Sequence, residues 1–226
     1  MAEAALEQYP LPPPHLRERV SGNTDPDTFR RVGSSAASRL LGIIAMTAAP
    51  EVLDWGCGPG RVAAHLTGVA GVSLHGCDPD AEAVAWCNEH LVPGRFAVSG
   101  LYPPLPYPDG SFDVVLAISV MTHLRRRTQL KWLAELARVL RPDGVLIATV
   151  HGRPAARGFG VADFSGIQDH YLDPFMADVL PADYYHTVLQ TPEYTREAWS
   201  GWFDIVAYEE GGLELHDLVT CCRKML

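Results

Sequence analysis

The sequence predicts an α/β fold in which a doubly wound, mostly parallel sheet ends in an antiparallel hairpin. Short apolar strands alternate with amphipathic helices over the first two thirds of the chain, which is the pattern of a parallel sheet whose strands are joined by helices. The last segment differs, because residues 202–209 and 213–224 are predicted as two strands joined by a turn at Glu210-Gly211-Gly212. The other expected elements are strands at 51–55, 73–77, 96–98, 112–119 and 145–150, and helices at 25–47, 61–66, 80–90, 128–140 and 192–199.

Local signals set several of these boundaries. Asp25-Pro26-Asp27 supplies an N-cap and an early proline for the first helix. The sequence Arg141-Pro142-Asp143-Gly144 ends the helix at 128–140. The strand at 112–119 is continuously apolar, as expected for a strand covered by helices on both faces.

Two segments fall outside this alternation. Residues 1–24 are proline-rich and are predicted to form an arm that lies over the domain rather than a long regular element. Residues 152–192 are rich in Gly, Pro, Asp, Tyr and Phe and exceed the usual length of a connection, so they are predicted to form a substrate lid. The remainder, residues 25–226, is expected to be a single domain that includes this lid.

Composition and charge narrow the function. The chain has 226 residues, 47% of them hydrophobic, and no apolar run approaches the ~20 residues that a membrane span requires. The N-terminus lacks the basic-then-apolar layout of a signal peptide, so a cytoplasmic protein without a membrane partner is expected. A formal net charge of -9 argues against nucleic acid as a partner and favours a small molecule or an acceptor protein as the substrate. The five cysteines lack the paired spacing of a zinc site, so no bound metal is expected. The protein is expected to be a monomer or a homodimer.

The most informative motif is the stretch 52–62, where an apolar strand ends in an acidic residue and is followed by three closely spaced glycines. Gly56, Gly58 and Gly60 allow positive φ angles and a close approach of the backbone to a ligand. From Arg61 onward the pattern is helical, and the N-terminal amides of a helix favour a ligand at the turn. The combination indicates a ligand that carries a nucleoside.

The spacing of the motif distinguishes between two kinds of nucleoside ligand. A dinucleotide fingerprint, G-x-G-x-x-G, would need its third glycine where Arg61 stands. Asp54 would also repel a pyrophosphate, whereas it would stabilise an ammonium group. A cationic ligand is therefore favoured over a dinucleotide.

Motif I of the class I S-adenosylmethionine (SAM) methyltransferases, a strand ending in D-x-G-x-G-x-G, resembles residues 54–60 without a gap. The segments S-V-M-T-H-L, W-L-A-E-L-A-R-V-L-R-P-D-G and T-V-H-G are similar to a branch of bacterial members that act on small molecules. The resemblance implies a Rossmann-like sheet of seven strands, SAM as the methyl donor and S-adenosylhomocysteine as the product. Asp143 is a departure, because the family commonly has glycine there, but aspartate tolerates turn geometry.

The cofactor site that the resemblance implies is drawn from five places along the chain. A carboxylate at Asp78, after the second strand, can accept both ribose hydroxyls; alternatively it caps the next helix, for which Asp80 is the better candidate. The loop Ser99-Gly100-Leu101 corresponds to the adenine contacts, although the family's frequent acidic residue is missing there. The cofactor-binding residues are thus expected to be Asp54, Gly56, Cys57, Gly58, Gly60, Arg61, Asp78, Pro79, Gly100, Leu101 and Ser119, with Phe29 and Arg30 enclosing the cofactor from the preceding helix.

Three histidines are the candidates for catalysis. His123 follows the fourth strand and suits a general base, since an unperturbed imidazole has a pKa of about 6.5; the alternative is a histidine that only shapes the turn. His151 ends the fifth strand, where side chains of open α/β sheets face the ligand. His186 belongs to the lid, whereas His216 and Asp217 are neighbours on a strand and therefore do not form a dyad.

These features predict a SAM-dependent methyltransferase that acts on an oxygen atom of a small, specialised metabolite. The sulfonium methyl group is already activated, so the protein mainly orients the acceptor and manages one proton. Transfer to nitrogen or carbon is an alternative. A SAM-binding protein without transferase activity, a SAM-assisted cyclase and, more distantly, a nicotinamide-linked oxidoreductase also remain as alternatives.

Overall fold

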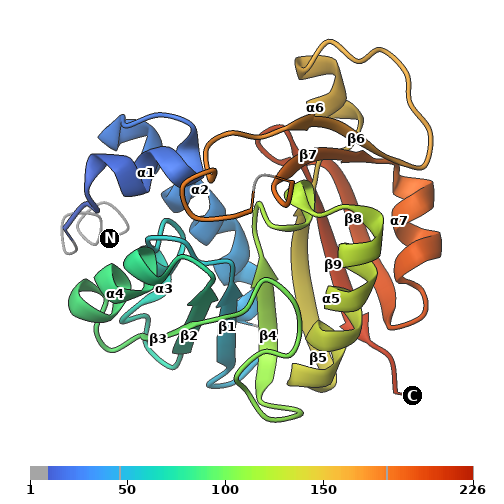
Figure 1. Ribbon diagram of the computed structural model, residues 1–226. Coiled ribbons are helices and arrows are strands. Elements are labelled where there is room, and N and C mark those ends of the chain that lie inside the picture. Colours follow the sequence, from blue (N-terminus) through green and yellow to red (C-terminus); the bar gives the residue numbers. More distant parts are fainter. Residues whose placement is uncertain (1–9, 46, 182, 226) are drawn as a thin grey trace. The chain divides into compact units, whose positions relative to one another are not determined.

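The structure is a computed structural model that describes residues 10–45, 47–181 and 183–225. Its strands form a mostly parallel seven-stranded sheet with a C-terminal antiparallel hairpin, which confirms the predicted fold class, and a separate two-stranded sheet. Figure 1 labels the helices and strands along the chain. By its internal contacts the chain divides into an N-terminal unit, Met1–Ser99, and a C-terminal unit, Gly100–Leu226. Within the part of the chain that is described, no helix has the length and apolar character needed to cross a membrane.

The N-terminal unit contributes three parallel strands in the order β3-β2-β1. Asp54 pairs with Gly76 in this register, so the end of β1 lies beside the end of β2. The helix α4 contacts β2 and β3. The elements of this part are β1 (Glu51–Trp55), α3 (Ala63–Leu66), β2 (Ser73–Asp78), α4 (Ala81–His90) and β3 (Arg95–Val98).

Two helices precede β1. Asp25 caps α2 (Pro26–Ile44) by accepting a hydrogen bond from the Thr28 N–H, as the sequence predicts. Within the predicted arm, Pro14–Ser21 form the short helix α1, which has a proline in its first turn and a buried side chain at Leu16. Residues 1–9 of that expected arm lie outside the described residues.

The C-terminal unit contributes four strands in the order β4-β5-β9-β8. β4 and β5 are parallel, whereas β9 pairs antiparallel with both β5 and β8. The helix α5 contacts β5, and α7 contacts β8. The elements of this sheet and its helices are β4 (Phe112–Ala117), the 3-10 helix η2 (Met121–His123), α5 (Arg126–Val139), β5 (Leu140–Val150), α7 (Pro192–Trp199), β8 (Phe203–Leu213) and β9 (His216–Arg223).

The segment predicted as a lid has regular structure of its own. It holds α6 (Arg153–Gly158) and two antiparallel strands, β6 (Ile167–Leu172) and β7 (His186–Gln190). Every residue of β7 is buried, so the strand shows no alternation that would reveal it in the sequence. The Gln190 N–H donates to the His151 carbonyl oxygen, which joins β7 to the end of β5.

The turn of the C-terminal hairpin lies four residues later than predicted, because β8 continues through the two glycines to Leu213 and the turn falls at Glu214-Leu215. Gly211 has a φ of 64°, and its N–H donates to the side chain of Asp217. The glycines therefore form an irregularity within the strand rather than its end.

Candidate functional site

The glycine turn after β1 has the backbone conformation that its sequence predicts. Gly56, Gly58 and Gly60 have φ angles of 77°, 50° and 81°, a region that side chains other than glycine rarely adopt. The N–H groups of Gly56 and Cys57 donate to the Cys77 carbonyl oxygen, at 2.8 and 3.2 Å, which fastens the turn to the end of β2. The turn is therefore a defined loop that is held against the end of β2.

Helices α1 and α2 pack directly on this turn. An alanine methyl at Gly33 of α2 would lie 2.0 Å from the Arg61 carbonyl oxygen, so glycine is required for the helix to approach. Arg61 in turn donates through Nη1 to the Val20 carbonyl oxygen at the end of α1, at 2.6 Å. The expected cofactor-enclosing residues Phe29, which is buried, and Arg30, which is half-buried, lie on α2 just before Gly33.

Gly33 and Gly42 allow a matched test of this packing, because both lie in α2. Gly33→Ala is expected to lower the free energy of unfolding by about 2–4 kcal/mol, since the new methyl meets the backbone of Arg61. Gly42→Ala meets nothing within 4 Å and is expected to raise the free energy of unfolding by about 0.5–1 kcal/mol, as alanine is the better helix former. Urea denaturation of the two variants measures both values, and equal effects would contradict the close contact of α2 with the turn.

Asp54 is a buried carboxylate beside the glycine turn. Its side chain is 3% exposed, and its Oδ2 is buried without a hydrogen-bond partner among the described residues. Burial, with a contribution from Asp78, raises the pKa of Asp54 to about 7, while the positive charge of Arg61 acts in the opposite direction. An unpartnered buried carboxylate oxygen is costly unless a cation or a donor binds to it, so this site suits a ligand with an ammonium group.

Asp78 holds the turn and the start of α4 together. Its Oδ2 accepts from the Gly58 N–H and its Oδ1 from the Asp80 N–H, both at 2.8 Å. Asp80 caps α4 by accepting from the N–H groups of Glu82 and Ala83, so the capping role open to Asp78 is filled by Asp80. Burial raises the pKa of Asp78 to about 6. Each of its oxygens keeps a second lone pair, with which hydroxyl groups of a ribose could bond.

The other expected cofactor residues divide between the two units. In the N-terminal unit, Cys57 is a buried free thiol and Pro79 is half-buried. In the C-terminal unit, Gly100 is exposed, and the Leu101 carbonyl oxygen accepts from the Tyr184 hydroxyl. Ser119 has a φ of 60°, and its N–H donates to Thr149 Oγ1 at 2.7 Å. Such a strained conformation at a strand end is typical of functional sites.

The C-terminal unit brings the three candidate histidines together. The Nδ1 of His123 lies 3.0 Å from the His186 carbonyl oxygen, and the rings of His123 and His151 have centroids 6.0 Å apart. His186 and His151 are buried, and the Nε2 of His186 lies 2.9 Å from the Asp183 carbonyl oxygen. Among the described residues, no group of histidine, cysteine and carboxylate side chains could hold a metal ion. Imidazole rings of this kind are suited to proton transfer or hydrogen bonding.

His123 has the tautomer of a general base. A carbonyl oxygen only accepts, so Nδ1 carries the proton in the bond to His186 and the basic lone pair of the neutral ring lies on Nε2. Tyr185 stacks on the imidazole with ring centroids 3.9 Å apart, which fixes the plane of the ring. Its side chain is 12% exposed, so small solutes have limited access to it.

His151 differs from His123 in its electrostatics. Its Nε2 lies 3.1 Å from the Nε2 of His216, so one ring donates to the other. Burial, with the nearby His216 and His123, lowers the pKa of His151 to about 2. A ring that stays neutral at all physiological pH values suits a hydrogen-bonding role better than a proton-accepting one.

His216 and Asp173 also belong to this cluster, although the sequence does not single them out as site residues. His216 reaches His151 because Val150 pairs with Asp217 in the antiparallel register of β5 and β9. Asp173 lies 4.0 Å from His123, measured from Oδ2 to Nδ1. Asp217 accepts from the Tyr208 hydroxyl and from the Gly211 N–H.

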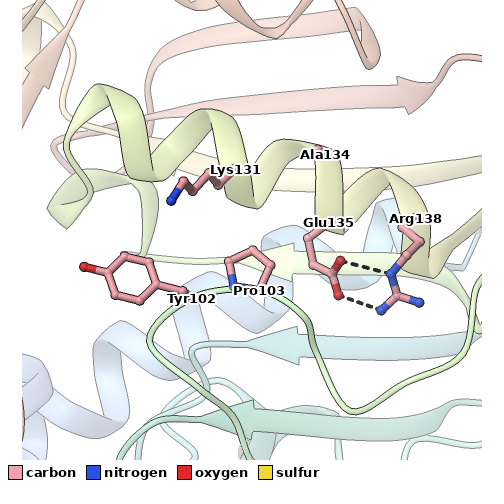
Figure 2. A pocket seen from close by; sticks show the side chains of 6 residues that line it. All are labelled: Tyr102, Pro103, Lys131, Ala134, Glu135 and Arg138. Carbon is pink, nitrogen blue, oxygen red and sulfur yellow. Dashed lines mark hydrogen bonds and ion pairs between the residues drawn. The ribbon is translucent and has the colours of Figure 1, made fainter.

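A surface pocket lies along α5 in the same unit, lined by Tyr102, Pro103, Lys131, Ala134, Glu135 and Arg138 (Figure 2). Glu135 and Arg138 pair through two hydrogen bonds, and Arg138 also binds Asp109. The Lys131 ammonium lies 5.5 Å from the centre of the Tyr102 ring. Arg138 is thus paired with Glu135 and Asp109, and Lys131 lies over an aromatic ring. The pocket therefore supports the loop before β4 rather than offering a reactive group.

Comparison with known proteins finds similarity to methyltransferases over part of the chain. Residues 53–148 match the family described as "Methyltransferase domain". The chain is 30% identical over 124 residues to 27-O-demethylrifamycin SV methyltransferase of Amycolatopsis mediterranei, covering 53% of this chain and 45% of that protein. It is 36% identical over 101 residues to fatty-acid O-methyltransferase of Mycolicibacterium smegmatis, covering 44% and 36%. The matched part thus spans less than half of either relative.

A solved structure extends the likeness over the whole fold. The 1,6-didemethyltoxoflavin-N1-methyltransferase of Burkholderia thailandensis, with bound 1,6-didemethyltoxoflavin and S-adenosylhomocysteine, has a TM-score of 0.64 at 20% identity, covering 96% of this chain and 92% of that one. The family match includes β1, the glycine turn and Asp78, the segments that carry the predicted motif. Residues 53–148 therefore match a methyltransferase domain, and the chain has the Rossmann-like fold of the SAM-dependent methyltransferases.

Proposed function

We propose that this chain transfers a methyl group from SAM to an oxygen atom of a small, specialised metabolite. The observation that carries the proposal is the unpartnered Oδ2 of Asp54, buried beside the glycine turn. An ammonium group is the partner that such an oxygen binds best. SAM carries one in its amino-acid part, whereas a dinucleotide has none. The methyltransferase family match over residues 53–148 supports the same donor.

The residues of the N-terminal unit fit SAM by their chemistry. Asp54 would bind the ammonium group, and Asp78 would bind the ribose hydroxyls with its remaining lone pairs. The glycine turn with Cys57, Arg61 and Pro79 would form the wall against the cofactor, with Phe29 and Arg30 of α2 enclosing it. Gly100, Leu101 and Ser119 are proposed as further contacts. Bound SAM supplies a methyl group already activated by its sulfonium.

The histidine cluster of the C-terminal unit would act on the acceptor. His123 would take the hydroxyl proton at Nε2, since its Nδ1–H is held by the His186 carbonyl oxygen. The neutral ring of His151 would orient the acceptor through a hydrogen bond, and His186 would fix His123 through its backbone. In this arrangement a single base removes one proton, the hydroxyl proton of the acceptor. An alcohol or a phenol requires this step.

The choice of oxygen rests on this base and on the relatives. Two relatives that match at 30% and 36% identity carry names that specify or imply methylation on oxygen. The toxoflavin-type neighbour methylates nitrogen by its name, so the fold itself does not select the atom. An amine acceptor would be methylated without His123, whereas a hydroxyl would depend on it.

Methyl transfer from isotope-labelled SAM to panels of alcohols, phenols, carboxylic acids and amines tests the proposal. The expected result is label on a hydroxyl oxygen, with S-adenosylhomocysteine formed in equal amount. Transfer only to nitrogen or carbon would contradict the oxygen assignment. SAM binding without S-adenosylhomocysteine formation, or a substrate cyclised without methylation, would favour the alternatives. Cytoplasmic location and a monomeric or dimeric state belong to the same proposal.

The affinity for SAM is expected to depend on pH through Asp54. In the free protein Asp54 has a pKa of about 7, so it is mostly protonated below that pH, and a cationic ligand requires its ionised form. Affinity should therefore fall as the pH is lowered from 8 to 6, by roughly five- to tenfold, with release of a proton on binding. Calorimetry at both pH values in two buffers of different ionisation enthalpy measures affinity and proton release. An affinity that does not change with pH would contradict the role of Asp54.

A further inference from the structure

We propose that Asp173 is a positioning residue for His123, whose negative charge supports the imidazole as it takes the proton of the acceptor. The proposal rests on the proposed function, in which His123 is the general base. Asp173 directly follows β6, in the segment that connects the two strands of the small antiparallel sheet.

Asp173 and His123 form a close and shielded pair. The distance from Asp173 Oδ2 to His123 Nδ1 is 4.0 Å, and the two side chains are 8% and 12% exposed. The same Nδ1 donates to the His186 carbonyl oxygen at 3.0 Å. The carbonyl therefore holds the proton of Nδ1 in place, while the carboxylate acts on the ring as a nearby charge.

Backbone hydrogen bonds fix both Asp173 and the ring that covers His123. The Asp173 N–H donates to the Tyr185 carbonyl oxygen at 2.9 Å, and Tyr185 stacks on His123. The Phe175 N–H donates to Asp173 Oδ1 at 3.1 Å, which holds that oxygen within its own loop. The other oxygen, Oδ2, is the one that lies toward His123. The loop between β6 and β7 thus sets the position of the carboxylate and the plane of the imidazole together.

The charged and titratable groups around His123 make Asp173 an effective partner. His151, at the end of β5, stays neutral because burial lowers its pKa. Arg125, before α5, approaches the His186 ring at 3.5 Å but pairs with Asp169 at 2.8 Å, and both of these side chains are nearly half exposed. Burial raises the pKa of Asp173 itself, so the ionised carboxylate gains from a positive charge on His123.

The proton balance of the step is complete. The acceptor oxygen forms a bond to the methyl carbon, the sulfur–methyl bond breaks with its electron pair on sulfur, and the hydroxyl proton moves to Nε2 of His123. The resulting imidazolium keeps its Nδ1–H on the His186 carbonyl and faces the Asp173 carboxylate. The proton then leaves to solvent, which restores the neutral base.

The test is the titration of His123 in the full chain, followed by NMR of its ring, in wild type and in Asp173→Asn. Asparagine keeps an acceptor for the Phe175 N–H and removes the charge. The expected result is a drop of about one unit in the pKa of His123. With the acceptor found by the labelled-SAM assay, the acidic limb of kcat/KM should move to lower pH by the same amount, and kcat at high pH should fall roughly three- to tenfold.

The controls separate this proposal from the proposed function. Asp169→Asn removes a carboxylate of the same small sheet that pairs with Arg125, and it should leave the His123 titration unchanged. Asp173→Glu keeps the negative charge, so the pKa of His123 in this variant should stay close to its wild-type value. An unchanged His123 titration in Asp173→Asn would overturn the positioning role, whereas a shifted titration with an unchanged pH–rate profile would overturn His123 as the base.

Discussion

Replacing Asp54 with asparagine is expected to weaken SAM binding at least about 100-fold at pH 8 and, at the same time, to stabilise the ligand-free protein. The binding loss follows because a hydrogen bond between a buried carboxylate and an ammonium group contributes several kcal/mol to the binding free energy. A 100-fold loss of affinity corresponds to about 2.7 kcal/mol. The gain in stability follows because the ionised carboxylate is buried with an unpartnered oxygen. Function and stability are therefore opposed at this position.

The gain in stability has a predicted pH dependence. The pKa of Asp54 is about 7 in the folded protein and near 3.8 when it is unperturbed, so its cost is fully present above pH 7 and disappears as the pH falls toward 4. Asp54→Asn should raise the free energy of unfolding by about 1–3 kcal/mol at pH 8 and by little at pH 4.5. Urea denaturation at the two pH values, with calorimetry for SAM, measures both effects.

Asp25→Asn is the matched control for this variant. Asparagine caps a helix as well as aspartate does, and the Asp25 carboxylate caps the start of α2, so neither the stability nor the affinity for SAM should change measurably. If Asp54→Asn bound SAM within a few-fold of wild type, or if its stability were equal to that of wild type at pH 8, the cationic site at the glycine turn would be refuted.

The second large effect is expected for His123→Gln, which should lower kcat about 100- to 1000-fold with the SAM dissociation constant unchanged. Glutamine can keep a donor for the His186 carbonyl oxygen but has no basic nitrogen. Single-turnover assays with the hydroxyl acceptor measure the chemical step apart from binding and product release.

His90→Gln is the corresponding control, because His90 lies at the end of α4 and contacts the backbone of Trp86. It should leave kcat unchanged. A fall of less than threefold for His123→Gln would show that the acceptor needs no base at this position, which would favour an amine or an acceptor that is already ionised.

Most of the fold was predictable because its signals are local. The cap at Asp25 and the glycine φ angles are set by residues within a few positions. The strands β6 and β7 escaped prediction because β7 is buried on both faces and β6 is largely exposed, so neither alternates. The hairpin turn lies later than the sequence predicts, because the hydrogen bond from the Gly211 N–H to the Asp217 side chain favours a bulge at the glycines.

The residues of the candidate site likewise divide into those that the sequence predicts and those that only the fold brings together. Asp54 and Asp78 follow from a contiguous motif and from the register of two neighbouring strands. The neighbours of the histidines could not be predicted, because His216 reaches His151 through the antiparallel pairing of β9 and Asp173 reaches His123 through an irregular loop. Residues brought together by tertiary structure leave no spacing in the sequence.

A crystal structure of the protein with S-adenosylhomocysteine tests the central claim most directly. The account predicts that the ammonium group of the ligand lies within hydrogen-bond distance of Asp54 Oδ2 and that its ribose hydroxyls contact Asp78, with the glycine turn against the nucleoside. A ligand bound elsewhere, or one whose ammonium group leaves Asp54 Oδ2 without a partner, would contradict it.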